Sequence, residues 1–378
     1  MQFLDLKTQY KSIKKEIDQA IKNVLDNCNF ILGPEVEKLE KNVAQYCGTK
    51  YGIALNSGTD ALLLSLKGLG IGPGDEVIVP SFTFIATPEA IVNVGAKPIF
   101  IDINPETFNI DIKQIEKLIT KKTKAIIPVH LFGQPAEMDK IVKIARKYKL
   151  KVIEDAAQAI GAKYSPPHQR FGGGGKNKKM CSIGDCGCLS FFPSKNLGGY
   201  GDGGMVVTNN KNLAKKITLL RAHGTTRKYH YQIIGTSSRL DALQSAVLSV
   251  KLKYLNKWAK VRQKNAAHYT KQFKNIQQIE TPKISDNCLS VFNQYTIRVK
   301  NRDKLQEYLK QNNIPTQIYY PSPLHLQPVF KYLKYKKNDL PETEKACKEV
   351  LSLPIYPELP TKDQDYIIKK IKEFYGQK

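Results

Sequence analysis

The segment SFFPSKNLGGYGDGG, residues 190–204, places one lysine where an amine could react. Lys195 follows the apolar run CLSFFP, which is typical of a strand, and precedes a glycine-rich turn that allows close approach of the backbone to a ligand. An amine becomes a nucleophile or a Schiff-base former when it loses its water and its pKa falls. A lysine at a strand end whose ammonium reaches solvent is the ordinary alternative, so this segment alone leaves both interpretations open.

Three further segments carry residues suited to a flat, phosphorylated ligand. In VIEDAAQ a strand ends at Glu154, which places the carboxylate of Asp155 where it could hold a protonated ring nitrogen. In LNSGTDALLL a strand leads through Ser57 and Gly58 into a helix, whose free N–H groups form an anion site. PSFTF, residues 80–84, supplies aromatic rings on the next loop. Pyridoxal 5'-phosphate (PLP) requires a lysine, an acid, a phosphate site and a flat partner together.

The elements that must position these residues alternate between strands and helices. From about residue 50, apolar runs such as YGIAL, DEVIVP and KLKVIEDA are separated by helical patterns, which predicts a largely parallel sheet covered on both faces. Beyond GGMVVTNN, long helices are predicted over residues 211–221 and from about Leu240 to Phe273. We therefore expect a large domain over residues 1–245 and a smaller α+β domain over residues 246–378.

Composition narrows the class of protein. The 378 residues carry 59 Lys and Arg against 34 Asp and Glu, a net charge of +25, so a basic nucleic-acid-binding protein is a rival hypothesis. The basic residues are spread along amphipathic segments, which solvated helix faces explain better. No apolar run is long enough for a membrane helix and no signal peptide is evident, so we expect a cytoplasmic protein. The seven cysteines lack paired Cys-x-x-Cys spacing, which favours buried thiols over a metal site.

The segment YSPPHQRFGGGGKNKKM, residues 164–180, contains four consecutive glycines. A phosphate-binding loop must follow a strand and open a helix, whereas this run leads into Lys and Asn and then another strand. A surface excursion is therefore the preferred interpretation.

An ordered set of motifs resembles the DegT/StrS-type nucleotide-sugar aminotransferases. The motifs are SGTDAL, PSFTFIAT, HLFGQPAEMD, IEDAAQ, GDCGCLSFFPSKNLGGYGDGG and SRLDALQSAVL, and the resemblance extends from FLDLKTQY to PTQIYYPSPLHLQ. It implies the α/β fold type I of PLP-dependent transferases, with a mostly parallel seven-stranded sheet between helices and a smaller C-terminal α+β domain. It also implies a homodimer whose active sites lie at the subunit interface.

The same resemblance gives roles to single residues at matching positions. Lys195 would form the Schiff base with PLP and then move protons, Asp155 would keep the ring nitrogen protonated, and Gln158 would bind the phenolic oxygen. The other implied cofactor contacts are ring stacking by Phe84, phosphate binding by Gly58, Thr59 and Ser190, and a contact from across the dimer by Ser237. Many relatives carry Asn at the last position, and the shorter serine would lose this contact or make it through water.

Candidate substrate contacts follow from the same comparison. Arg239 could bind the carboxylate of the amino donor or a sugar substituent, with a salt bridge to Asp241 or another acid as the ordinary alternative. Tyr319 stands where relatives acting on uronic sugars often carry His, which favours an uncharged group at C6 of the sugar. The remaining candidates are Tyr320 and three histidines that could equally be ordinary loop residues, His223, His230 and His325.

The expected activity is PLP-dependent transfer of an amino group from an amino acid, L-glutamate, to a nucleotide-diphosphate keto sugar for glycan, lipopolysaccharide or lipid A biosynthesis. RAHGTTRKYHYQIIG and IYYPSPLHLQ resemble the branch that aminates C3, and amination at C4 is the alternative. A dehydratase of this fold would replace the lysine of PSKNL. A regulatory relative that senses the cofactor and, in a different class, a nucleic-acid-binding protein without cofactor are the other rivals.

Overall fold

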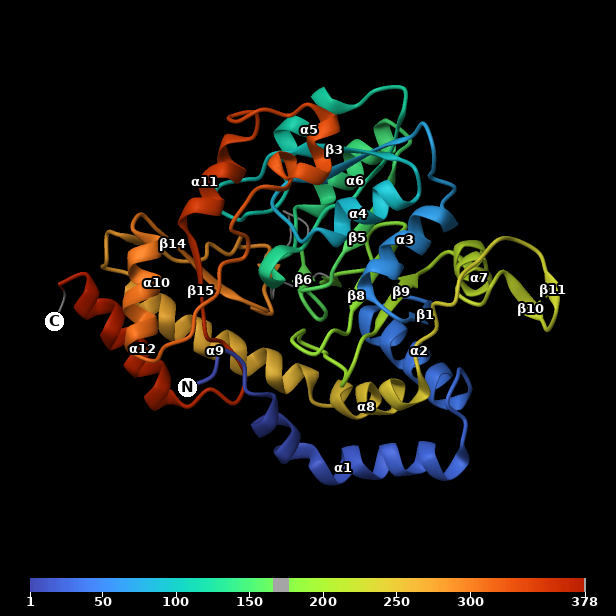
Figure 1. The fold of residues 1–378 in the computed structure, drawn as a ribbon, viewed down its shortest axis with the longest axis horizontal. Coiled ribbons are helices and arrows are strands. Elements are labelled where there is room, and N and C mark those ends of the chain that lie inside the picture. Colours follow the sequence, from blue (N-terminus) through green and yellow to red (C-terminus); the bar gives the residue numbers. More distant parts are fainter. Residues whose placement is uncertain (166–176, 377–378) are drawn as a thin grey trace.

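A seven-stranded sheet forms the centre of the larger part of the chain (Figure 1). The computed structural model describes residues 1–165 and 177–376. Along the sheet the strands are β1 (Tyr51–Leu55), β9 (Gly204–Thr208), β8 (Cys186–Ser190), β5 (Lys151–Asp155), β4 (Thr123–Ile126), β2 (Glu76–Pro80) and β3 (Lys97–Ile101). Only β9 runs antiparallel to its neighbours, β1 and β8. The mostly parallel seven-stranded sheet expected from the sequence is confirmed.

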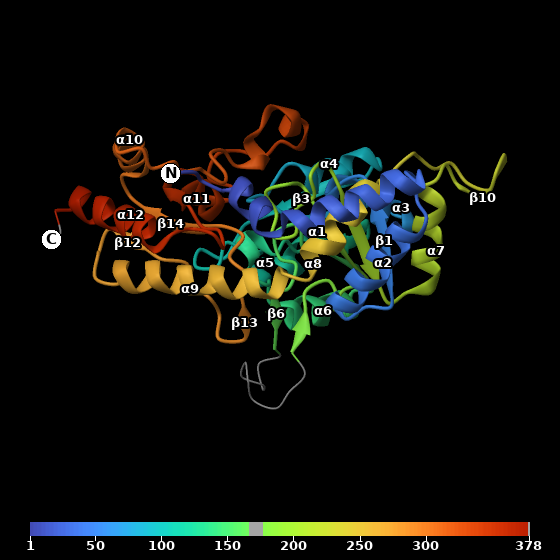
Figure 2. The same cartoon turned by 90° about the horizontal axis from the view of Figure 1, so that it is seen from below.

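Helices cover both faces of this sheet, which explains why its strands are apolar on both sides. The core on one face contains side chains from α3 (Gly58–Gly68), α4 (Ala86–Asn93) and α7 (Lys211–Leu220). The core on the other face contains side chains from α2 (Pro34–Cys47), α5 (Ile112–Leu118), α6 (Met138–Lys147) and α8 (Ala242–Leu252). Helix α1 (Leu6–Asn27) lies along α8 on the outside (Figures 1 and 2).

The C-terminal part of the chain has a hydrophobic core of its own, which includes the buried Tyr269 and Tyr295. A three-stranded sheet in the order β12-β14-β15 lies at its centre. Its elements are α9 (Leu255–Phe273), β12 (Ile279–Glu280), β14 (Tyr295–Val299), α10 (Arg302–Gln311), α11 (Pro341–Glu349), β15 (Val350–Leu353) and α12 (Thr361–Phe374). Short 3-10 helices occur at η1 (Leu131–Gly133), η2 (Leu324–Leu326) and η3 (Pro328–Leu333).

The single helix expected from Leu240 to Phe273 is wrong, because the chain forms two helices, α8 and α9. At the junction the N–H of Lys253 donates to the carbonyl of Val250 at 3.2 Å, and the N–H of Tyr254 donates to that of Lys251 at 3.0 Å. These bonds span three residues instead of four, so the last turn of α8 tightens and α9 starts afresh.

The glycine-rich run in residues 164–180 falls largely on residues 166–176, which lie outside the described residues. On either side of it, β6 (Lys163–Tyr164) pairs antiparallel with β7 (Lys178–Lys179), and β13 (Cys288–Leu289) pairs with β6. A second hairpin, β10 (Thr225–Arg227) and β11 (His230–Tyr231), projects from the large sheet assembly (Figures 1 and 2).

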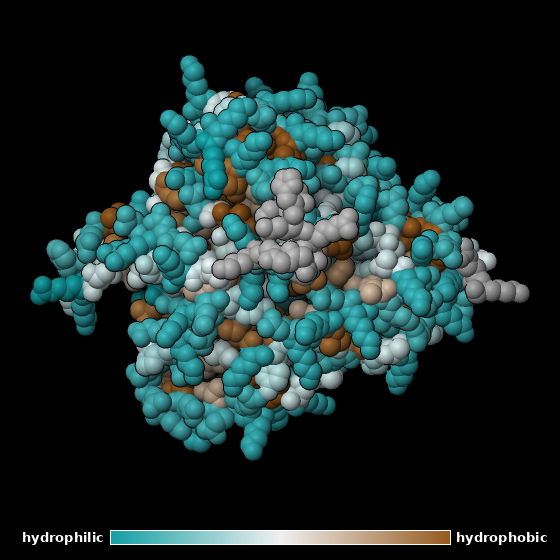
Figure 3. All heavy atoms as spheres, turned by 180° about the vertical axis from the view of Figure 1, so that it is seen from behind, coloured by the Kyte–Doolittle hydropathy of each residue, from teal (hydrophilic) through white to brown (hydrophobic). Residues whose placement is uncertain are grey.

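The surface is dominated by polar side chains. Figure 3 shows hydrophilic residues over most of the face seen from behind, with small apolar areas between them. Cys181, Cys186 and Cys188 are buried with free thiols, as expected for core cysteines. Among the helices of the described segments, none has the length and apolar character needed to cross a membrane.

Candidate active site

The carboxyl ends of β5 and β8 meet at one edge of the large sheet. The two strands are parallel neighbours, with Asp155 paired to Cys188, and they end at Asp155 and Ser190. Strand β1 runs in the same direction as β8, since both are antiparallel to β9, and it leads into α3 at Gly58. The fold therefore brings the predicted acid, the predicted phosphate residues and the segment that follows β8 to the same edge.

Asp155 is buried, with 5% of its surface exposed, and neutral groups hold its carboxylate. One oxygen accepts from Thr87 Oγ1 at 2.7 Å, and the other accepts from the N–H of Ala157 at 3.1 Å. Within residues 1–165 and 177–376, it makes no ion pair. A buried carboxylate without a cation is energetically costly, so Asp155 is suited to pair with a cationic atom of a ligand.

Lys195 lies in the turn that follows β8, where its N–H donates to the carbonyl of Phe192 at 2.9 Å. Loss of water around the amine lowers the pKa of Lys195, and the negative charge of Asp155 opposes this shift by a smaller amount. A lowered pKa raises the fraction of neutral, nucleophilic amine near neutral pH. Lys195 is partly exposed, and its lowered pKa favours the reactive amine over a fully solvated ammonium.

The start of α3 packs tightly against the end of β8. Ser57 caps the helix by accepting from the N–H of Asp60 at 3.0 Å, which leaves the first helical N–H groups free. A Cβ atom on Gly58 would lie only 2.7 Å from Ser190 Cβ, and one on Gly204 would lie 2.2 Å from the Ser57 carbonyl oxygen. The glycines thus place the free N–H groups of Gly58 and its neighbour Thr59 beside the hydroxyl-bearing Ser190, an arrangement suited to a phosphate.

Gln158, Phe84 and Tyr320 form a connected group near this edge of the sheet. Gln158 is buried, accepts from the N–H of Phe132 at 2.7 Å, and donates from Nε2 to the hydroxyl of Tyr320 at 3.3 Å. The ring of Phe84 is 55% exposed and lies 6.3 Å from that of Tyr320. Burial and the charge of Asp155 raise the pKa of Tyr320, so its hydroxyl keeps its proton.

The segment containing Ser237 and Arg239 lies near the start of α3. Ser238 Oγ donates to the side chain of Asn56, the residue before the helix cap, at 3.1 Å. The guanidinium of Arg239 donates to Ser237 Oγ at 2.8 Å instead of pairing with Asp241. Among residues 1–165 and 177–376 of one chain, Arg239 makes no salt bridge with Asp241 or another acid.

The histidines proposed as substrate contacts lie in different settings. His325 is buried, with Nδ1 at 2.8 Å from Ser81 Oγ and Nε2 at 3.3 Å from a Glu344 oxygen, so both ring nitrogens already have protein partners. His223 is exposed, and His230 lies on the projecting hairpin. Tyr319 lies beside Phe3, with ring centroids 6.4 Å apart. Tyr319 also adjoins Tyr320, with ring centroids 5.9 Å apart, so it lies next to the residue that Gln158 contacts.

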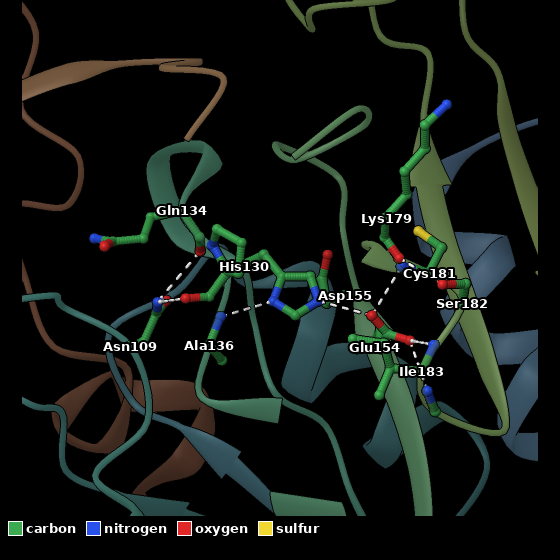
Figure 4. A network of polar contacts seen from close by, with 12 residues as sticks. Asn109, His130, Gln134, Ala136, Glu154, Asp155, Lys179, Cys181, Ser182 and Ile183 are labelled. Carbon is green, nitrogen blue, oxygen red and sulfur yellow. Dashed lines mark hydrogen bonds and ion pairs between the residues drawn. The ribbon is translucent and has the colours of Figure 1, made fainter. Parts of the chain in front are cut away.

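Beneath Asp155 a buried network fixes the end of β5, and the motif comparison did not identify it (Figure 4). The carboxylate of Glu154 accepts from the N–H groups of Cys181, Ile183 and Gly184 at 2.7–2.8 Å and from His130 Nε2 at 3.1 Å. The N–H of Ala136 donates to Nδ1 of the same histidine, which assigns the ring proton to Nε2. The N–H of His130 also donates to the carbonyl of Asp155 at 3.0 Å.

Thr87 was also not singled out from the sequence, although it lies within the motif PSFTFIAT. Its position three residues after Phe84, in the first turn of α4, is the only sequence signal that could have suggested it. Taken together, the unpaired buried carboxylate, the amine with lowered pKa and the open helix start fit the pyridine nitrogen, the aldehyde and the phosphate of PLP.

Comparison with known proteins decides the family. Residues 11–372 match the model of the DegT/DnrJ/EryC1/StrS aminotransferase family. The chain belongs to this family. It is 46% identical over 361 residues, 96% of each chain, to a Pseudomonas aeruginosa protein named UDP-2-acetamido-2-deoxy-3-oxo-D-glucuronate aminotransferase. A Geobacillus stearothermophilus protein named pleiotropic regulatory protein is 50% identical over 98% of each chain.

The fold agrees with this membership. The crystal structure of DesV from S. venezuelae superposes with a TM-score of 0.95 at 39% identity, covering 100% of this chain and 99% of that one. The aminotransferases of the family depend on PLP, so this member is a PLP-dependent aminotransferase of fold type I.

The network under Asp155 predicts a large loss of stability in Glu154→Gln. The amide would turn a donor toward N–H groups that now meet an acceptor, so the free energy of unfolding should fall by about 3 kcal/mol. Urea denaturation followed by circular dichroism measures this. Glu116→Gln is the control, because it removes only an exposed ion pair with Lys147 and should cost less than about 1 kcal/mol. Equal losses in both variants would contradict the importance of the network.

The lowered pKa of Lys195 predicts a pH dependence of stability in the cofactor-free protein. Between that lowered pKa and the ordinary value of 10.5, the unfolded chain binds more protons at this residue than the native chain does. The stability of the wild type relative to Lys195→Met should therefore rise with pH across this interval and then level off. Denaturation curves at a series of alkaline pH values measure the difference, in which all other lysines cancel. A difference that stays constant or falls would show that Lys195 is not desolvated.

Proposed function

We propose that this aminotransferase moves the amino group of L-glutamate to the C3 keto group of a nucleotide-diphosphate sugar. The observation that carries the site assignment is the position of Lys195, in the turn after β8, at the same sheet edge as the buried carboxylate of Asp155, and the lowered pKa of its amine supports it. The choice of C3 is supported by the name of the P. aeruginosa relative, which specifies a 3-oxo UDP sugar. Amination at C4 remains the alternative that the experiment below distinguishes.

The proposed roles follow from the charge and the hydrogen-bonding capacity of each side chain. Bound PLP supplies an electron sink for the carbon that exchanges its amino group. Asp155 would bind the protonated ring nitrogen, because that cation offsets its buried charge. Gln158 would direct its amide toward the phenolic oxygen, with Tyr320 and the Phe132 backbone fixing its orientation. Lys195 would bind the carbonyl carbon of PLP.

Lys195 would also carry the proton between the two carbon centres. A base must be neutral before it accepts a proton, and the lowered pKa makes this state accessible near neutral pH. The phosphate would be bound by the N–H groups of Gly58 and Thr59 and by the hydroxyl of Ser190. The face of Phe84, which is more than half exposed, would stack on the ring.

A second copy of the chain would complete this site. Phe84, which follows β2, and Phe192, three residues before Lys195, are 55% and 51% exposed, and Tyr231 and Ile234 are 61% and 93% exposed before the segment that holds Arg239. Large apolar side chains that are left exposed in a single chain support burial at an interface. We therefore propose a homodimer in which residues 235–241 of one protomer reach the site of its partner.

The amino-transfer reaction tests the central residues. We expect the wild type to transfer nitrogen from 15N-labelled glutamate to C3 of a 3-keto UDP or dTDP sugar, as measured by mass gain and by the NMR position of the new amine. Lys195→Ala should lose more than about a thousandfold in turnover, because its base and its covalent anchor disappear together. Lys257→Ala, an exposed lysine of α9, should retain full activity.

The same panel should include 4-keto sugars and sugars with a hydroxymethyl, methyl or carboxylate group at C6. Nitrogen found at C4 would replace the proposal by its alternative. Full turnover by Lys195→Ala would overturn the assignment of the lysine. No transfer with any sugar, despite bound PLP, would favour a regulatory role.

The shared site predicts complementation between two inactive variants. When Lys195→Ala and Arg239→Ala chains are co-expressed, half of the dimers are mixed and each mixed dimer holds one intact site, so activity should return to about a quarter of the wild-type value. Lys195→Ala with Asp155→Ala is the control, because both residues come from the same protomer and no intact site can form. Equal, near-zero activity in both mixtures would contradict a contribution of Arg239 across the dimer.

A further inference from the structure

Helix α8 presents two polar side chains to the glycine-rich turn that follows Lys195. Gln244 and Lys251 are seven residues apart, which is two helical turns, so they lie on the same face of the helix. Lys251 Nζ donates to the carbonyl of Gly198, and Gln244 Oε1 accepts from the N–H of Tyr200 at 2.7 Å. In Figure 1 this turn is the loop between β8 and β9, beside α8. The two side chains thus bind backbone groups on either side of Gly199, the carbonyl of Gly198 and the N–H of Tyr200.

The burial of Lys251 is unusual for a lysine. Only 1% of its surface is exposed, and among the residues that the structure describes its ammonium takes part in no ion pair. Its contacts are the Gly198 carbonyl and the ring of Tyr200, whose centroid lies 5.1 Å from Nζ. Loss of water lowers the pKa of Lys251 to about 8, against the opposing charge of Glu358, so the amine still carries its proton at neutral pH.

Packing alone does not explain a lysine at this position. Neighbouring core residues of α8, Ala246, Val247, Leu248 and Val250, are apolar, and an apolar side chain at position 251 would avoid the cost of burying an ammonium. The carbonyl of Gly198 would then lack this donor. The buried amine of Lys251 is explained if the conformation of the turn requires a hydrogen-bond donor to the carbonyl of Gly198.

The turn has little freedom to adjust. A Cβ atom on Gly198 would lie 2.3 Å from the Pro193 carbonyl oxygen, and one on Gly199 would lie 2.9 Å from Gln244 Oε1. The N–H of Gly199 also donates to the carbonyl of Phe191 at 2.7 Å, which closes a loop around Lys195. A change in the conformation of residues 198–200 would therefore shift the backbone of Lys195, because only a few tightly packed residues separate them.

We propose that Gln244 and Lys251 are positioning residues, which hold residues 198–200 against α8 and thereby fix the Lys195 amine where it meets PLP. This inference rests on the role proposed above for Lys195. Neither side chain is assigned a contact with the substrate or the cofactor. They act through the two backbone groups they bind.

The test compares Lys251→Met, Gln244→Met and the double variant with the wild type. Gln244→Met keeps the length of the side chain and Lys251→Met shortens it by one atom, and each substitution removes the hydrogen bond. In the cofactor-free proteins, hydrogen exchange should quicken in residues 191–204 and stay unchanged in the sheet core. With added PLP, the rate of covalent attachment to Lys195, trapped with borohydride and located by mass spectrometry, should fall about tenfold in each single variant.

The double variant should also fall about tenfold and not a hundredfold, because releasing either contact already frees the same turn. Lys253→Met is the control: it removes an exposed lysine that pairs with Glu16, and it should change neither measurement. Gln244 is only partly buried, so Gln244→Met decides the question if Lys251→Met does not fold.

Two outcomes would overturn the inference. One is attachment at the wild-type rate in the single variants, and the other is faster exchange throughout the protein instead of in the turn. If the wild type itself bound PLP at a residue other than Lys195, the proposed function would fail, whereas the exchange measurement would still show whether α8 holds the turn.

Discussion

The buried carboxylate of Asp155, with only neutral donors around it, is the constraint on which the site depends. Placing a negative charge inside a protein without a cation costs several kcal/mol unless hydrogen bonds and a ligand offset it. Thr87 and the Ala157 N–H supply two hydrogen bonds, and the carboxylate lies at the carboxyl end of β5. A cationic ring nitrogen would offset this charge, which is the role proposed for Asp155.

Glu154 and Asp155 are consecutive carboxylates of β5, and their surroundings differ. Successive side chains of a strand point to opposite faces. The carboxylate of Glu154 accepts hydrogen bonds from three backbone N–H groups and from the imidazole of His130, so all its hydrogen bonds are made within the protein. Asp155 accepts two hydrogen bonds from neutral groups, and its proposed partner is the ring nitrogen of PLP. The same strand thus carries a structural anchor on one face and the proposed binding group on the other.

Strand ends could be predicted to within a few residues because they depend on local patterns: β5 was expected to end at Glu154 and ends at Asp155, and the expected strand CLSFFP stops at Ser190. Asp155, Ser190 and Gly58 each follow an apolar run, and carboxyl ends of parallel strands must meet at one edge. The motif resemblance then assigned Lys195 and Gln158 to one cofactor. The break between α8 and α9 was missed because the helical pattern continues through Lys253 and Tyr254, where only a change in hydrogen bonding separates the helices.

Long-range contacts could not be predicted in this way. His325 stands in a loop-like sequence, yet it is buried against Ser81, which is 244 residues away along the chain. Likewise, Tyr320 reaches Gln158 across 162 residues, and Lys251 reaches the Gly198 carbonyl across 53. A single sequence contains no signal for such pairs, since either partner alone is an ordinary polar residue. They become visible only when the packing of the C-terminal part on the large sheet is known.

The role of Asp155 can be measured directly at the atom that it is proposed to bind. The 15N NMR signal of PLP labelled at its ring nitrogen reports whether that nitrogen carries a proton in the wild type and in Asp155→Ala. We predict a protonated nitrogen in the wild type and an unprotonated one in the variant at the same pH, because the buried carboxylate favours the charged form. An identical protonation state in the two proteins would contradict the claim that the site is organised around this charge.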